Sequence, residues 1–302
     1  MLLLRYLREG LRRPFVAHET TRLLQGQVRE SQQIVKQAGL GAMRVEYQSP
    51  PAMRGEVLLI LGRRMLRYVP AEGVVHESRA PETGVLGRAG ALVEGLRSGA
   101  VRARVVGREE VAGRNAAIVE VRGAGREGFF KRLWIDTQSG VRMKIEDVDP
   151  SGVVVSTSYF TRIDLDPVLD AGEFRPGSLS RREARPRPLR TRPLASVAEA
   201  QQRVGYAIRE PSLPPGYRLV GVWVAPAPVG RQAVILRYTD GVSTFTLSQH
   251  PAPARWGSRG ADQAPRPRDD RGAIRWVSGG RVFILVGNLS PHAVDRIIAS
   301  LR

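Results

Sequence analysis

The sequence predicts a mainly β protein of the α+β class, built as two domains. Three observations support this prediction. Apolar and polar residues alternate over most of the chain, Gly and Pro interrupt that alternation at short intervals, and helical periodicity is confined to a few short stretches. With 302 residues, of which 42% are hydrophobic, the chain can bury a core in each of two domains of ordinary size.

Residues 1–175 are expected to form an open, curled antiparallel half-barrel of about eleven strands with two helices. The first helix ends at Pro14, and from Phe15 the period changes to two. Short strands separated by Gly and Pro then follow one another. A second helical pattern over residues 84–99 interrupts them, and strands resume up to residue 165. A sheet with this many strands is expected to curl rather than remain flat.

Residues 176–195 carry six arginines, one glutamate and several prolines, and they predict an extended linker. Residues 196–302 predict a smaller α+β domain of about five strands with a helix at each end. Ser196 and Glu199 have the spacing of a capping box, and Asp240-Gly241 and Gly279-Gly280 are typical of hairpin turns.

The hairpin from Phe129 to Gly152 is the most regular part of the first domain. One face of its two strands is expected to be apolar, and the other carries charged residues such as Arg142, Lys144 and Glu146, with Phe130 and Trp134 as exceptions. An apolar face of this kind is by default part of a core. A half-barrel with few helices can also leave a groove for acyl chains, with these candidate lining residues: Phe129, Leu133, Ile135, Val141, Met143 and Ile145.

The net charge of +18 comes almost entirely from arginine, because only three of the 47 basic residues are lysines. A GC-rich genome gives this bias without selection for binding. The alternative is a surface that attracts anionic groups such as lipid headgroups. Nucleic acid is not expected as a partner, because the densest basic segment, residues 176–195, has no aromatic residues for stacking on bases.

No motif for catalysis, metal binding or cofactor binding stands out, and the sequence predicts a protein that is not an enzyme. There is no cysteine, which excludes disulfides and thiolate metal sites. The Gly123–Gly128 stretch matches G-x-G-x-x-G, but a strand pattern follows it instead of the helix that a dinucleotide site needs. The histidines are isolated along the chain: His18, His76, His250 and His292.

Two further features bear on partners and location. Trp256 lies in a loop rich in Pro, Arg and Asp and is a candidate interface residue, although it can equally pack on its own domain. No run of apolar residues approaches the length of a transmembrane helix, and the apolar run at the start is too short for a signal peptide. The sequence alone therefore indicates the cytosol, unless the true start lies upstream.

The order of these segments resembles a known family. The stretches "RLWIDTQSGVRMKIEDVDPSG" and "YFTRIDLDPVLDAGEFRP" are similar to the half-barrel domain of MucB/RseB-type sigma-factor regulators, which has the fold of LolA-like lipoprotein carriers. "LPPGYRLVGVWV" and the strands after it are similar to the small C-terminal domain of the same regulators.

The resemblance implies a non-enzymatic envelope-stress regulator in the periplasm. Such a protein binds the extracytoplasmic part of a membrane-bound anti-sigma factor and senses lipid or lipoprotein signals. The alternatives are a periplasmic lipid or lipoprotein carrier, and a hydrolase whose site is assembled from distant segments. The resemblance transfers no individual contact residue, because its motifs are diffuse.

Overall fold

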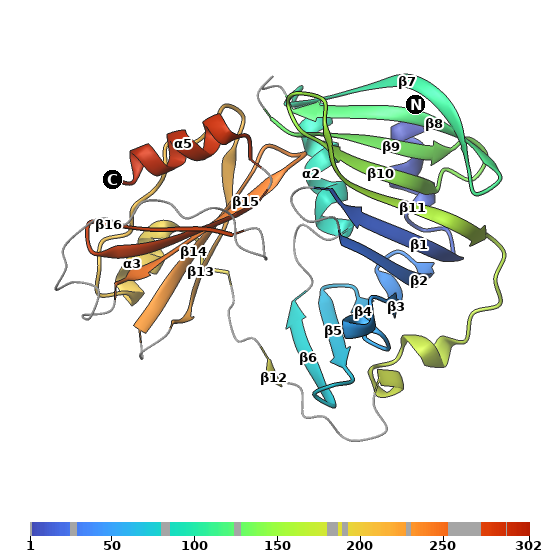
Figure 1. Ribbon diagram of the computed structural model, residues 1–302, viewed down its shortest axis with the longest axis horizontal. Coiled ribbons are helices and arrows are strands. Elements are labelled where there is room, and N and C mark those ends of the chain that lie inside the picture. Colours follow the sequence, from blue (N-terminus) through green and yellow to red (C-terminus); the bar gives the residue numbers. More distant parts are fainter. Residues whose placement is uncertain are drawn as a thin grey trace. The chain divides into compact units, whose positions relative to one another are not determined.

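The structure is a computed structural model, and it describes residues 2–24, 29–79, 85–123, 128–179, 187–188, 193–227, 231–252, 273–287 and 289–302 (Figure 1). The chain divides into two compact units. Unit 1 consists of Met1–Arg97, Arg102–Arg122 and Phe130–Leu189, and unit 2 consists of Ser98–Val101, Gly123–Phe129 and Arg190–Arg302.

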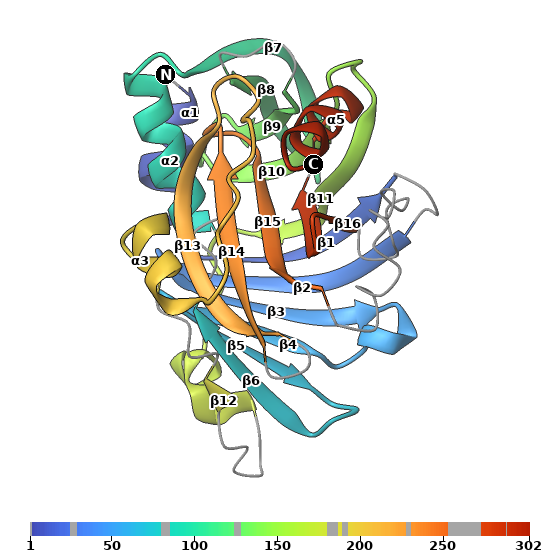
Figure 2. The same ribbon diagram turned by 90° about the vertical axis from the view of Figure 1, so that its left-hand side faces the viewer.

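A single large sheet dominates unit 1. Eleven strands run antiparallel to their neighbours, and the two-residue strand β12, Arg187–Pro188, adds in parallel to β6. The order across the sheet is β12-β6-β5-β4-β3-β2-β1-β11-β10-β9-β8-β7, and Figure 2 shows how strongly its strands curve. The strands are β1 Phe15–Leu23, β2 Arg29–Gly39, β3 Ala42–Ser49, β4 Val57–Leu61, β5 Arg64–Val69, β6 Val74–Arg79, β7 Val101–Val111, β8 Arg114–Gly123, β9 Phe130–Asp136, β10 Arg142–Val148 and β11 Val154–Asp164.

The N-terminal helix begins as α1, Leu2–Arg5, and continues as one π-helical turn, η1, Tyr6–Gly10. The amide of Leu11 donates to the carbonyl of Tyr6, five residues earlier, at 3.0 Å. Leu3 and Leu11, on either side of this wider turn, are buried, whereas Leu4 is exposed. The second helix, α2, spans Val85–Arg97.

The two faces of the large sheet are covered differently. On one face Val35 lies opposite both Ala17 and Val45, and these three side chains pack in a core with Phe15 and Phe160. On the other face of β4–β6, the side chains of Leu59, Leu66 and Val75 are buried under Phe174 and Leu179. Phe174 and Leu179 come from two short 3-10 turns, η3 Ala171–Phe174 and η4 Pro176–Leu179.

Strand β7 forms one edge of the large sheet, and among the strands that the structure describes its neighbour is β8. Val101 and Val111 at its two ends are buried, whereas nearly all residues between them are exposed. Val105 and Val106 are among the most exposed large apolar side chains of the described chain.

Unit 2 contains a five-stranded sheet in the order β13-β14-β15-β17-β16. Its strands are β13 Arg218–Ala227, β14 Arg231–Thr239, β15 Thr244–Pro251, β16 Ala273–Ser278 and β17 Arg281–Gly287. Helices α3, Val197–Arg203, and α5, Pro291–Ser300, contribute to one core with the sheet, in which Trp276 stacks on Phe283. Ser196 caps α3 by accepting from the amide of Glu199, as its spacing predicts.

The predicted fold class is confirmed, including the eleven antiparallel strands of the first sheet and the smaller second sheet. Asp240-Gly241 and Gly279-Gly280 connect paired strands, as predicted. Within the described residues, no helix combines the length and the apolar character needed to cross a membrane.

Candidate functional site

The turn between β9 and β10 is organised by one buried carboxylate. Asp136, with a side chain 2% exposed, accepts hydrogen bonds from the amide of Ser139 at 2.9 Å and from its hydroxyl, and it pairs with Arg114 Nη2 at 3.0 Å. Burial disfavours the ionised form, but the bonds from Ser139 and Arg114 outweigh it and hold the pKa of Asp136 below its ordinary value. Gly140 completes the turn at φ +72°, a conformation that favours glycine.

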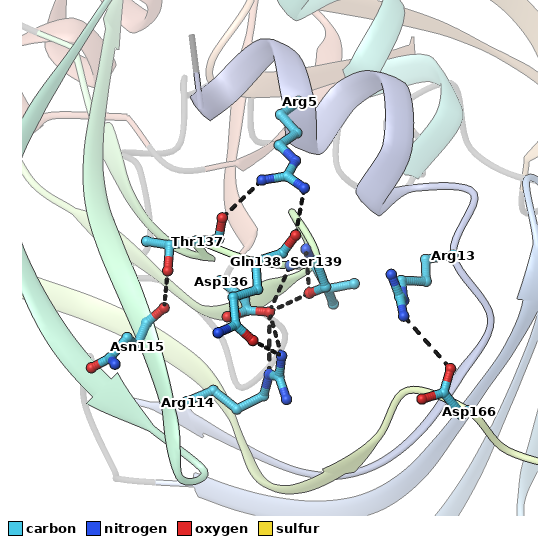
Figure 3. Close-up of polar contacts among 10 residues, drawn as sticks. Arg5, Arg13, Arg114, Asn115, Asp136, Thr137, Gln138, Ser139 and Asp166 are labelled. Carbon is cyan, nitrogen blue, oxygen red and sulfur yellow. Dashed lines mark hydrogen bonds and ion pairs between the residues drawn. The ribbon is translucent and has the colours of Figure 1, made fainter.

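The N-terminal helix docks on this turn (Figure 3). Arg5 donates from Nη1 to the carbonyl of Thr137 at 2.8 Å and from Nη2 to the carbonyl of Gln138. A Cβ added at Gly10 would lie 2.0 Å from the carbonyl oxygen of Gly140, so the helix and the turn touch through their backbones. These contacts tie the start of the chain to a turn about 130 residues later.

The Asp136–Gly140 turn therefore explains the "WID-x-x-SG" part of the resemblance without a ligand. Its carboxylate, hydroxyl and glycine fix the turn, and Arg5 satisfies two of its carbonyls. The feature of the sequence that predicts this hydrogen-bonded turn is the spacing of Asp136, Ser139 and Gly140. Nothing in the sequence pairs Arg5 or Arg114 with it.

The two faces of the β9–β10 hairpin do not alternate as predicted. Arg142 pairs with Ile135, but Lys144 pairs with the preceding residue, Trp134, so β10 carries one extra residue at this point. The extra residue brings Arg142 to the same face as Ile135. The prediction that Arg142 points away from the apolar face is therefore wrong.

The opposite face of the hairpin holds aromatic rings under cationic groups. Lys144 Nζ lies 4.1 Å from the centroid of the Trp134 ring, and Arg122 Cζ lies 3.3 Å from that of Phe130. Both rings are buried, although the sequence places them on the charged face. The buried carboxylate of Glu120 accepts from Arg122, whose bond is the largest cause that holds the pKa of Glu120 below its ordinary value.

Most of the predicted groove residues are deeply buried. Leu133, Ile135, Val141 and Met143 are 0–4% exposed, and Phe129, which belongs to unit 2, is 3% exposed. Ile145 remains partly exposed and pairs with Leu133 on one face. A ligand can therefore reach most of these side chains only if the residues over them move. Trp256 lies outside the described residues.

A strip of half-buried apolar side chains lies instead on β3, β4 and β5. Register places its members on the face that also carries Val35, Val45 and Ala17. We call it the β3–β5 strip, and it consists of Met43, Tyr47, Leu58, Ile60 and Met65. Sequence reasoning missed these residues because the short strands read as an ordinary core.

Between Val35 and the hairpin, the same face also carries a polar cluster beside the apolar Ala17 and Phe160. Gln33 Nε2 donates to Glu19 Oε2 at 3.0 Å, and Glu19 Oε1 lies 3.4 Å from Arg142 Nη2. Both Glu19 and Arg142 lie at irregularities of the strand register, which aim side chains away from their regular direction. In the described part of the chain, no group of three His, Asp or Glu side chains is placed to hold a metal ion.

Part of the sequence matches a known protein family. Residues 86–178 match the family described as the MucB/RseB N-terminal domain. This range contains β7 to β11 and the Asp136 turn. The resemblance to MucB/RseB-type proteins is thereby confirmed. The β3–β5 strip lies outside the matched range.

One curated relative is the sigma factor AlgU regulatory protein MucB of Pseudomonas aeruginosa, which is 22% identical over 201 residues. The alignment covers 66% of this chain and 60% of the relative, so it spans less than two thirds of that protein.

Solved structures of MucB extend the likeness to nearly the whole chain. A crystal structure of MucB in complex with MucA(peri) matches with a TM-score of 0.64, 16% identity and coverage of 99% of this chain and 97% of that chain. The complex structure of Pseudomonas aeruginosa MucA/MucB matches with a TM-score of 0.65, 15% identity and coverage of 100% and 97%. At this identity the structural matches establish that the MucB-type fold is shared.

Proposed function

We propose that this protein is a non-enzymatic regulator that binds the extracytoplasmic part of a membrane-bound anti-sigma factor. The observation that supports this proposal most strongly is the match of residues 86–178 to the MucB/RseB N-terminal domain. The relatives add support, since one is named as a sigma-factor regulatory protein and MucB has been solved with MucA(peri). The proposed role places the protein in the periplasm.

The proposal also includes a sensing function for unit 1, in which the half-barrel takes up an acyl chain of a lipid or lipoprotein. The β3–β5 strip supports this, because its side chains are apolar apart from the Tyr47 hydroxyl, face one way and keep part of their surface in water. Ile145 is the hairpin candidate with comparable exposure. The buried candidates Leu133, Ile135 and Met143 would form the floor beneath a bound chain.

Direct binding to the extracytoplasmic segment of the organism's own anti-sigma factor tests the first part. We expect the full chain to form a one-to-one complex by calorimetry with a dissociation constant of about 1 μM or tighter, as for specific protein pairs. A segment of equal length and charge but scrambled sequence is the control. Equal binding of both segments, or of neither, would exclude the proposed regulator.

Replacing Ile60 with glutamine tests the β3–β5 strip. We expect the affinity for a fluorescent sixteen-carbon fatty acid to fall about five- to tenfold. Fully burying a side chain of this size contributes about 1.5–3 kcal/mol, and Ile60 is already partly buried before the ligand binds. Val153→Gln is the matched control, since Val153 is 60% exposed in the turn before β11. An equal loss in both variants, or no loss in Ile60→Gln, would remove the strip from the binding surface.

A lipid or lipoprotein carrier is the second candidate function, because an acyl site on the β3–β5 strip would need only the half-barrel. The discriminating measurement is competition between the two classes of partner. A regulator binds the anti-sigma segment in the absence of lipid and releases it when lipid is added. A carrier binds lipidated protein and ignores the segment.

A further inference from the structure

Arginine side chains gather at one end of the five-stranded sheet of unit 2. Arg281 begins β17 and pairs with Pro251 at the end of β15, and Arg231 begins β14 beside it. Arg231 Nη1 donates to the carbonyl of Pro251 at 2.9 Å and to that of Ala252. Two guanidinium groups therefore emerge where three strands begin or end.

A third arginine, Arg209, reaches the same end from the segment after α3. Its Nη1 donates to the carbonyl of Leu301 at 3.0 Å. Its guanidinium also lies against the hairpin turn that leads into Arg281, because a Cβ added at Gly279 would be 2.6 Å from Arg209 Nη2. Arg209 and Arg281 thus flank one turn.

These three charges have no acidic counterpart in the described chain. No carboxylate oxygen there lies within 4.0 Å of a nitrogen of Arg209, Arg231 or Arg281. Arg281 is the extreme case, since its Nη1 is buried and has no hydrogen-bond acceptor in the described chain, and its Cζ lies 5.8 Å from the centroid of the Tyr206 ring. Burial, and then the charge of Arg209, lower the pKa of Arg281.

A half-buried guanidinium beside another cation is costly unless an anion compensates it. Arginine presents N–H groups in a planar fork that matches the oxygens of phosphate, and charge-assisted bonds of this type are strong. A pair of arginines that share one turn therefore suits a group with two negative charges better than a single carboxylate.

We propose that Arg209 and Arg281 form a phosphate-binding site at the β16–β17 turn of unit 2, with Arg231 at its rim. The ligand is a phosphate monoester or inorganic phosphate, so the source is either a lipid headgroup or the free ion. All residues and contacts of the proposed site lie within unit 2.

Calorimetric titration of the full chain with inorganic phosphate at constant ionic strength tests the site. We expect saturable binding that weakens at least tenfold in Arg281→Gln. Arg275→Gln is the matched control, because it removes the same charge from an exposed position on the neighbouring strand β16. Its affinity should stay within twofold of the parent.

The variant itself is expected to fold. Removing a half-buried charge without a partner should leave the melting temperature of Arg281→Gln in phosphate-free buffer equal to or above that of the parent. Arg209→Gln provides a second variant with the same expected loss of phosphate binding. Absence of phosphate binding by the parent chain, or equal affinity in Arg281→Gln and Arg275→Gln, would overturn the proposal.

Vesicle flotation then identifies the source of the phosphate. If the ligand is a headgroup, the parent and Arg275→Gln should float with vesicles that contain phosphatidic acid, whereas Arg281→Gln should not. None of the three proteins should float with vesicles of pure phosphatidylcholine. Phosphate binding without flotation would assign the site to the free ion. Flotation that persists in Arg281→Gln would reject the headgroup as ligand of this site.

Discussion

Replacing Asp136 with alanine is expected to lower the free energy of unfolding by about 3–4 kcal/mol. The substitution removes a carboxylate that is almost fully buried, and it leaves Arg114 and the amide and hydroxyl of Ser139 without their acceptor. Breaking a buried pair by removing one partner typically costs about 3–5 kcal/mol. Urea unfolding followed by tryptophan fluorescence measures the loss, and Trp134 at the end of the same strand is a suitable probe.

Asp166→Ala is the control for this prediction. Asp166 pairs with Arg13 at 3.6 Å, but its side chain is 90% exposed. Exposed pairs contribute about 0–1 kcal/mol, so the control should unfold almost as the parent does. Similar losses of unfolding free energy in the two variants would show that the buried Asp136 carboxylate does not stabilise the hairpin.

The contribution of Asp136 should also depend on pH with a defined sign. Its folded-state pKa is below the ordinary value, so the stabilisation is present above the unfolded-state pKa of about 4 and is lost as the pH falls through the folded-state value. The difference in unfolding free energy between the parent and Asp136→Ala should therefore shrink from pH 7 to pH 3. A constant difference would contradict the assigned pKa direction.

Replacing Gly10 with alanine is expected to cost about 2–3 kcal/mol, which is the upper part of the range for overpacking. The added Cβ would be 2.0 Å from the carbonyl oxygen of Gly140 and 2.7 Å from its carbonyl carbon. Both are backbone atoms, so the helix must move away and the bonds from Arg5 to Thr137 and Gln138 lengthen. Protection of the first ten residues in hydrogen exchange should fall with the stability.

Gly90→Ala in α2 is the matched control, because a Cβ there meets nothing within 4 Å. Alanine is favoured over glycine inside a helix by about 0.5–1 kcal/mol, so this variant should be neutral or more stable. A loss in Gly10→Ala no larger than the change in Gly90→Ala would mean that the N-terminal helix does not need close contact with the turn.

The strands could be predicted from the sequence because each one shows its own alternation of apolar and polar residues and is bounded by Gly or Pro. The sequence could not predict the extra residue between Arg142 and Lys144, since a bulge is defined by the pairing with another strand. It could not predict why Phe130 and Trp134 are buried either. Arg122 and Lys144, which lie over these rings, come from neighbouring strands, and Trp134 also packs in a core with Val111 and Ala116.

The candidate site was less accessible to prediction than the fold. The apolar pattern of the hairpin was visible, but its residues proved to be among the most buried of the sheet, and their role in a groove stays a proposal. The β3–β5 strip depends on which face of three short strands is left partly uncovered. The site at Arg209 and Arg281 depends on a missing counter-ion, which composition cannot show in a chain with 47 basic residues.

The edge strand β7 bears on how this protein behaves at high concentration. An open sheet exposes a row of unpaired backbone groups, and a second copy could extend it indefinitely. Along β7 the exposed residues include Arg102, Arg104, Arg108 and Glu110. A strand from a second copy that paired with β7 would desolvate these charged side chains, and this cost opposes edge-to-edge association. These charges lie beside the exposed Val105 and Val106, so the edge combines apolar surface with groups that oppose strand addition.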